Sequence, residues 1–156
     1  MRNRFLALIL TLFLPVLVVA STIYEGKVVK IADDDTLTLL VDSKQHRIRL
    51  SDIDTPERKQ PFGTRAKQAL SQLAFGKQAR VVEVTVDRYG RIVGRVYVDG
   101  LDVNRELVAQ GHAWVYRKYS DHAELLELEA QAKEKGLGLW ASPNPIPPWE
   151  WRRSHK

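Results

Sequence analysis

Two acidic clusters in the sequence contain the residue types that bind a divalent cation and activate a water molecule. Asp33-Asp34-Asp35 ends one apolar run, and Asp54 and Glu57 follow the end of a later one. Carboxylate oxygens are hard ligands that suit Ca²⁺, and a glutamate can accept a proton from an attacking water. Arg49, just before the second cluster, can face a phosphate group. Together these residue types predict hydrolysis of a phosphodiester bond.

Each cluster taken alone has a simpler explanation. An aspartate triplet is typical of a polar turn, and a lone glutamate after proline is usually a solvated loop residue. An EF-hand is excluded, because counting from Asp33 puts Leu37 at the fifth position and no glutamate at the twelfth. The pairing of Asp35 with Asp54 favours the functional interpretation, since two neighbouring carboxylates repel each other unless a cation lies between them.

The apolar pattern predicts five short strands and about three helices. Strands are expected at 23–31, 36–41, 46–50, 82–86 and 92–98. Helices are expected at 64–75, from Val103 until Gly111, and from Asp121, with a capping box, to near Gly136. This order suits a five-stranded Greek-key barrel of the OB type, which is an α+β fold that is mainly β. Composition alone does not separate this barrel from another α+β arrangement.

Both ends of the chain differ from the domain predicted at 21–141. Residues 1–20 combine basic residues near the start, an apolar run and a small residue at Ala20, which predicts a secretory signal peptide cleaved before Ser21. A retained membrane anchor is the alternative. The tail at 142–156 is rich in proline and tryptophan and ends in basic residues. We expect it to wrap partly around the domain without forming a regular helix or central strand, and a free tail with a basic end is the alternative.

Composition limits the partners and the metal chemistry. The 24 basic and 19 acidic side chains give a net charge of +5, and loss of Arg2 and Arg4 with the signal peptide leaves +3. A mildly basic protein suits an anionic partner. Cysteine is absent, which excludes disulfides and thiolate zinc sites, and the four histidines form no ligand pair at helical spacing. The length remaining after cleavage is enough for one domain with one core.

The joint set of motifs resembles the staphylococcal nuclease family. The motifs are Asp33-Asp34-Asp35-Thr36, Arg49, Asp54-Thr55-Pro56-Glu57 and Asp87-Arg88-Tyr89-Gly90-Arg91, within a resemblance that spans about 23–140. The resemblance implies the OB-type barrel and a calcium-dependent nuclease that cuts DNA and RNA with little sequence specificity, giving 3′-phosphate ends. With the signal peptide, it predicts a secreted or periplasmic monomer that has no stable membrane association after cleavage.

The resemblance also implies the ligands of the cation. Asp35 and Asp54 are direct ligands of Ca²⁺, the backbone carbonyl of Thr55 is a third, and Asp33 orients ligands or waters around them. Asp34 departs from the family pattern, in which a glycine is frequent at the middle of this turn. An additional negative charge is therefore expected beside the cation.

Three residues are predicted to take part in the reaction at the phosphate. Glu57 is the expected general base for the attacking water, while Arg49 and Arg91 are expected to stabilise negative charge on the phosphate oxygens. Residue types alone would treat Arg49 like Arg47, two positions earlier on the same strand face, as a solvated residue. Only the resemblance singles out Arg49.

Aromatic and basic residues are expected to hold the nucleic acid away from the scissile bond. Tyr119 is the best candidate for packing near a base, and Tyr89 is a second tentative candidate. The other members of this weak signal are Arg88, Arg95, Tyr116, Arg117 and Lys118, whereas Trp114 and Trp140 are expected to pack in the protein. The loop at 58–62 and the turn at 87–91 are short compared with the family's best-known member, so a preference for single or double strands does not transfer.

Two other function classes compete with the enzyme. One is an OB-type module that binds nucleic acid and has an inactive metal site. The other is a membrane-anchored protein whose basic tail contacts anionic lipid or a cell-wall polymer. Neither alternative explains why Asp35, Asp54 and Glu57 occur together.

Overall fold

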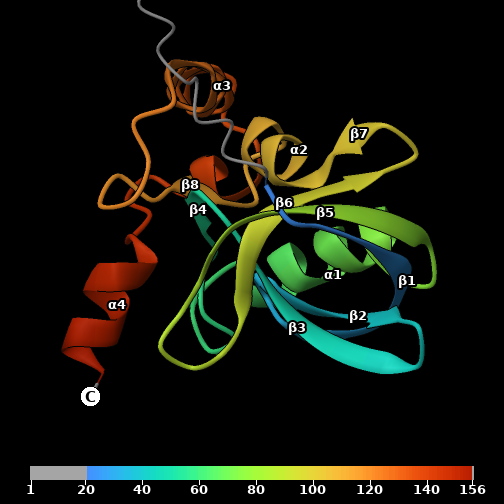
Figure 1. Cartoon of the computed structure of the whole chain (residues 1–156). Coiled ribbons are helices and arrows are strands. Elements are labelled where there is room, and N and C mark those ends of the chain that lie inside the picture. The colour runs from blue at the N-terminus through green and yellow to red at the C-terminus, as the bar shows by residue number, and fades with distance from the viewer. Residues whose placement is uncertain (1–20, 156) are drawn as a thin grey trace, which may run out of the picture.

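The computed structural model describes residues 21–155, and its centre is a closed five-stranded barrel (Figure 1). The barrel strands are β1 (Ile23–Asp33), β2 (Thr36–Val41), β3 (Lys44–Leu50), β5 (Gln78–Val86) and β6 (Ile92–Val98). They run in the order β3-β2-β1-β5-β6, and a parallel pairing of β3 with β6 closes the ring. The predicted OB-type α+β fold is confirmed, and each predicted strand lies within an observed one.

Strand β1 bends so that it serves two sides of the barrel. Its first half pairs with β5 and its second half with β2, with register shifts between Val28 and Lys30 and between Ile31 and Asp33. Such bulges increase the twist and allow a small sheet to close. Where β6 pairs with β5, a Cβ on Gly94 would lie 2.6 Å from the carbonyl oxygen of Val82, so only glycine fits there.

Three short strands were not predicted from the sequence. Strand β4 (Ile53–Asp54) pairs with β8 (Trp114–Val115), and β7 (Leu101–Asp102) extends the barrel sheet beyond β6. Each has two residues, which is too short for an alternating pattern. The β4–β8 pair nevertheless fixes the backbone of Asp54 opposite Trp114, at the place where the second acidic cluster begins.

The three predicted helices are present as α1 (Gly63–Ala74), α2 (Val103–Ala109) and α3 (Ala123–Glu134). Helix α1 buries Ala66, Ala69 and Leu70, as the helical spacing predicts, and Ala69 and Leu70 belong to the hydrophobic core. The predicted capping box at Asp121 is wrong. Helix α3 starts after His122, and no side chain caps its first turn. Propensity locates such helix ends only within one or two residues.

The prediction that the tail forms no regular helix is also wrong. A short 3₁₀ helix, η1 (Gly138–Ala141), leads to a proline-rich stretch and then to α4 (Pro148–Ser154). Proline fits the first helical position, because its missing N–H is not needed there. The tail packs against the domain through the tryptophans, in agreement with the predicted wrapping, since Trp149 stacks on Tyr116 with ring centroids 5.5 Å apart.

The predicted signal peptide lies outside the described residues. In the part of the chain that the structure describes, no helix has the length and apolar character needed to cross a membrane.

The buried side chain of Asn104 on α2 connects this helix by hydrogen bonds to the region where β3 pairs with β6. Its Oδ1 accepts a hydrogen bond from the N–H of Val96 at 3.0 Å. Its Nδ2 donates to the carbonyl oxygens of Ser51 at 3.0 Å and Gly94 at 3.3 Å. Because Asn104 is buried, water cannot replace these bonds. The amide therefore stabilises the end of β3, which follows directly on Arg49.

Asn104→Ala is expected to lower the free energy of unfolding by about 2–3 kcal/mol, because buried backbone groups lose their partner. Urea denaturation measures this change. Asn144→Ala, in the exposed tail, is the matched control and should change stability by less than about 0.5 kcal/mol. Equal stability of the Asn104 variant and the parent protein would contradict the role given to this amide.

Candidate active site

One cleft with a volume of about 870 Å³ is lined by all eight residues predicted as metal ligands, catalytic groups or tyrosine contacts to substrate. These residues are Asp35, Arg49, Asp54, Thr55, Glu57, Tyr89, Arg91 and Tyr119. They come from the β1–β2 turn, strand β3, the segment that starts at β4, the β5–β6 turn and the segment after β8. The fold thus brings together residues that are far apart in the sequence.

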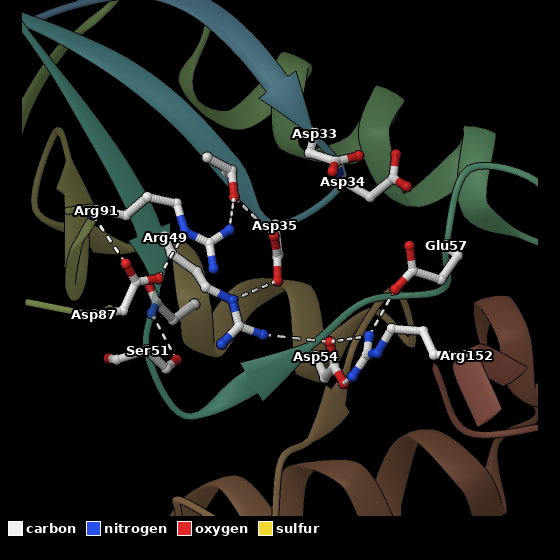
Figure 2. Close-up of polar contacts among 12 residues, drawn as sticks. Asp33, Asp34, Asp35, Arg49, Ser51, Asp54, Glu57, Asp87, Arg91 and Arg152 are labelled. Atoms are coloured by element: carbon white, nitrogen blue, oxygen red, sulfur yellow. Dashed lines mark hydrogen bonds and ion pairs between the residues drawn. The ribbon is translucent and has the colours of Figure 1, made fainter. Parts of the chain in front are cut away.

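Arg49 lies between the two acidic clusters and contacts both (Figure 2). Its Nε donates to Oδ2 of Asp35 at 3.0 Å, and its Nη2 donates to Oδ1 of Asp54 at 3.4 Å. The register explains the first contact, because Thr36 on β2 faces Arg49 on β3. Arg49 therefore differs from Arg47 on the same strand, because the side chain of Arg47 is exposed.

The charges of Asp35, Arg49 and Asp54, which lie in a row, influence one another. Burial raises the pKa of Asp54 above its ordinary value, and the charge of Asp35 adds to this effect, although Arg152 and Arg49 oppose it. Burial works against the charged form of Arg49, but Asp35 and Asp54 outweigh it, so that the pKa of Arg49 is raised. Asp35 and Asp54 thus share the positive charge of Arg49 between them.

Arg91 reaches the cleft from the β5–β6 turn, and Asp87 holds it in place. Asp87 Oδ1 accepts the N–H groups of Tyr89 at 2.9 Å and Arg91 at 3.0 Å, while its Oδ2 accepts Nε of Arg91 at 2.7 Å. Burial works against the charge of Asp87, but these bonds outweigh it and lower its pKa. Nη1 of Arg91 lies 3.5 Å from Oγ1 of Thr36, so Arg91 and Arg49 approach the same edge of the barrel.

The two tyrosines predicted to contact substrate lie on the rim of the cleft. Tyr89 is 65% exposed and Tyr119 is 63% exposed, unusual values for large aromatic side chains. The charged groups of Arg88 and Lys118 lie over these rings at 4.9 and 5.2 Å. Exposed rings next to cationic groups are suited to stacking with bases and attracting phosphates.

Asp33 and Asp34 lie apart from the row formed by Asp35, Arg49 and Asp54 (Figure 2). Asp33 accepts the N–H of Asp34 at 3.0 Å, as expected in a turn. The carboxylate of Asp34 is buried without a hydrogen-bond partner among the described residues. Burial, followed by the charge of Asp33, raises the pKa of Asp34 to about 7. The extra acid that replaces the usual glycine thus loses much of its charge near neutral pH.

Two basic residues expected to help bind nucleic acid are engaged elsewhere. Arg95 forms ion pairs with Asp52 and Asp102, and Arg117 pairs with buried Glu129. Burial disfavours the charge of Glu129, but hydrogen bonds from Arg117 and its neighbours outweigh this and lower the pKa of Glu129. Neither Arg95 nor Arg117 is among the described residues that line the cleft. Their charges stabilise the fold.

Sequence reasoning missed the contact that Arg152 makes with the acids. Nη2 of Arg152 donates to Oδ2 of Asp54 at 2.7 Å, and its Nη1 donates to Oε1 of Glu57 at 2.6 Å. The two partners are more than ninety residues earlier in the chain, and the tail has no alternating pattern that could locate them. The role of Asp87 was missed too, although an aspartate at the first position of a turn is a recognisable signal.

Comparison with known proteins agrees with this arrangement. The model of the family described as "Staphylococcal nuclease homologue" matches residues 47–142, which is more than half of the chain. The chain belongs to the staphylococcal nuclease family. The matched region includes Arg49, Asp54, Glu57 and Arg91. Asp35 lies in front of it, and the contact with Arg49 connects Asp35 to the matched region.

Individual relatives extend the similarity over nearly the whole chain. Protein ParB of Escherichia coli is 45% identical over 154 residues, covering 90% of this chain and 87% of the relative. Micrococcal nuclease of Shigella flexneri is 42% identical over 144 residues, covering 85% and 83%. An endonuclease of Haemophilus influenzae described as uncharacterized is 44% identical over 131 residues, covering 83% and 74%. The names of two of these relatives thus agree with membership of a nuclease family.

Proposed function

We propose that the protein is an exported, calcium-dependent nuclease. It hydrolyses phosphodiester bonds of DNA and RNA with little sequence specificity and leaves 3′-phosphate ends. The observation that carries the proposal is the single cleft in which Arg49 contacts both Asp35 and Asp54, with Glu57 and Arg91 on its walls. Membership of the staphylococcal nuclease family supports it.

The donor set in the cleft fits a hard cation. Asp35 and Asp54 are held around one guanidinium group and offer only oxygen atoms, and the backbone carbonyl of Thr55 is the third proposed ligand. Within residues 21–155, no group of three or more histidine, cysteine, aspartate or glutamate side chains is arranged to hold a metal. A cation would therefore depend on water and substrate for much of its coordination, which Ca²⁺ tolerates well. When bound, it supplies positive charge beside the scissile phosphate.

The chain's own residues divide the remaining work. Glu57 accepts a proton from a water molecule as the oxygen of that water attacks phosphorus in line with the leaving group. The bond from phosphorus to the sugar 5′ oxygen breaks, and this oxygen takes up a proton from solvent. Arg49 and Arg91 donate hydrogen bonds to the phosphate oxygens, on which negative charge accumulates in the transition state.

Substrate binding away from the scissile bond relies on shape and charge. Tyr89 and Tyr119 stack with bases, while Arg88 and Lys118, which lie over these rings, attract phosphates. Stacking accepts every base, since each has an aromatic face. Little sequence specificity is the expected consequence.

Calcium is expected to support cleavage far better than magnesium, because magnesium demands a tighter octahedron and loses water reluctantly. The test is plasmid and RNA digestion by chelated protein to which each metal is added back. Asp35→Asn should weaken calcium binding and cleavage, whereas Asp121→Asn, on an exposed residue, should change neither. Equal rates with both metals, or full activity in chelator, would overturn the proposed metal site. A parent protein that binds DNA but cuts it with no divalent metal would be a binding module.

Export is proposed from the sequence of residues 1–20. The exported protein should begin at Ser21 and be recovered outside the cytoplasm in soluble form. Mass spectrometry of the intact exported protein measures its N-terminus. An intact Met1 end in the membrane fraction would instead indicate a retained anchor.

A further inference from the structure

Helix α4 is held against the rim of the cleft by packing that does not involve Arg152. Trp149 stacks on Tyr116 at an interplanar angle of 7°, and its edge meets Trp114 at 5.8 Å. Pro148 is buried, and the side chain of Gln60 donates a hydrogen bond to the carbonyl of Ile146. Tyr116 itself lines the cleft. These contacts fix the position of α4 beside Asp54 and Glu57, and Arg152 extends from the helix toward them.

Arg152 engages two acids that the proposed reaction needs. Both carboxylate oxygens of Asp54 accept hydrogen bonds from it, at 2.7 Å for Oδ2 and 3.3 Å for Oδ1. Glu57 accepts a third, at 2.6 Å. The side chain of Asp54 is only 2% exposed, so the guanidinium groups of Arg152 and Arg49, rather than water, compensate its charge (Figure 2).

The direction of these bonds distinguishes between two roles for Arg152. A guanidinium that binds substrate phosphate would direct its N–H groups into the open cleft, as a fork. Both terminal nitrogens of Arg152 instead donate to Asp54 and Glu57. Asp54 is a proposed cation ligand and Glu57 is the proposed base. Arg152 therefore binds these two acids and not a position for the substrate phosphate.

We propose that Arg152 is a tethered competitor of the divalent cation. In the metal-free protein it compensates the charge of Asp54 and Glu57 in place of a metal ion. A cation that binds Asp35 and Asp54 displaces the guanidinium, because the two positive charges repel each other and seek the same oxygen atoms. Displacement also frees Glu57 to accept a proton. This inference rests on the metal site of the proposed function and adds a residue that sets its cation affinity.

Calcium titration of the full chain without nucleic acid tests the competition, with isothermal calorimetry as the readout. Arg152→Gln is expected to bind calcium at least tenfold more tightly than the parent protein. Arg153→Gln is the matched control, since Arg153 is exposed on the same helix, and its affinity should not change. Trp149→Ala removes the stacking that seats α4 and should tighten calcium binding by a smaller factor.

Thermal unfolding provides a second readout that does not depend on activity. Without metal, Arg152→Gln should melt at a lower temperature than the parent, because Asp54 loses one of the two guanidinium groups that compensate its charge. Calcium should then raise its melting temperature by more than it raises that of the parent, since tighter binding to the folded state gives more stabilisation.

The outcomes separate this inference from the proposed function. Equal or weaker calcium binding by Arg152→Gln, with measurable binding by the parent, overturns the competition and leaves the metal site standing. Unchanged calcium affinity together with weaker DNA binding would make Arg152 a phosphate contact instead. Absence of calcium binding by the parent and every variant overturns the metal site and the competition together.

Discussion

Changing Glu57 to glutamine is expected to lower the rate of DNA cleavage in a single turnover by about 10²- to 10⁴-fold. Glutamine keeps the size of the side chain and can still accept a hydrogen bond from Arg152, but it cannot take the proton of an attacking water. The side chain of Glu57 is 36% exposed, so a water molecule can reach it. Binding of calcium and of DNA should remain nearly normal.

Three measurements separate loss of the base from loss of the site. Single-turnover rates report the chemical step, calcium titration reports the metal site, and DNA affinity at one fixed salt concentration reports substrate binding. Glu134→Gln, on exposed α3 surface, is the matched control and should cut as fast as the parent. Cleavage by the Glu57 variant at the parental rate would remove Glu57 from the mechanism.

The strands and helices with regular patterns could be predicted because a single buried face determines each of them. Helix α1 buries one stripe against the barrel, and β6 alternates buried and partly buried residues along all seven positions. Such patterns follow directly from the period of each element. The pairing of β3 with β6 did not follow from them. It joins Ile48 to Ile92 and Leu50 to Gly94, residues far apart in the sequence, and is therefore a tertiary feature.

Elements whose stability comes from distant contacts could not be predicted. The two-residue strands β4 and β8 exist only because they pair with each other across sixty residues of chain. Helix α4 has seven residues, fewer than an isolated helix needs, and its tryptophan packs on the domain. The sequence indicated that the tail contains anchoring residues, whereas the helix itself depends on that packing.

The candidate site was predictable to the extent that its residues form a known set of motifs. That set identified Asp35, Arg49 and Glu57, which the structure gathers in one cleft. It contained no information on Arg152, because the tail lies beyond the motifs and the contact joins residues 95 and 98 positions apart in the chain. Residue types alone left Arg95 and Arg117 as candidates, although each compensates an acid within the fold.

Replacing either Arg49 or Arg91 with alanine is expected to lower kcat by about a hundredfold or more, as for other donors lost from a transition state. The effect on DNA affinity should be smaller, because the charge on the phosphate oxygens grows during the reaction. Lysine at either position should restore only part of the rate, since it keeps the charge without the planar pair of donors. Single-turnover rates and DNA affinity at fixed salt measure the two effects.

Arg47→Ala is the control for Arg49, because the two arginines share a strand face and differ in what they contact. Arg47 is exposed, whereas Arg49 contacts Asp35 and Asp54. Calcium titration of the Arg49 variant is needed as well, since removal of a charge from between two carboxylates also changes their affinity for a cation. If rate and DNA affinity fell by the same factor in both variants, the arginines would bind substrate without favouring the transition state. If neither variant lost activity, the assignment of both arginines would be wrong, and charge stabilisation would have to come from other groups in the cleft.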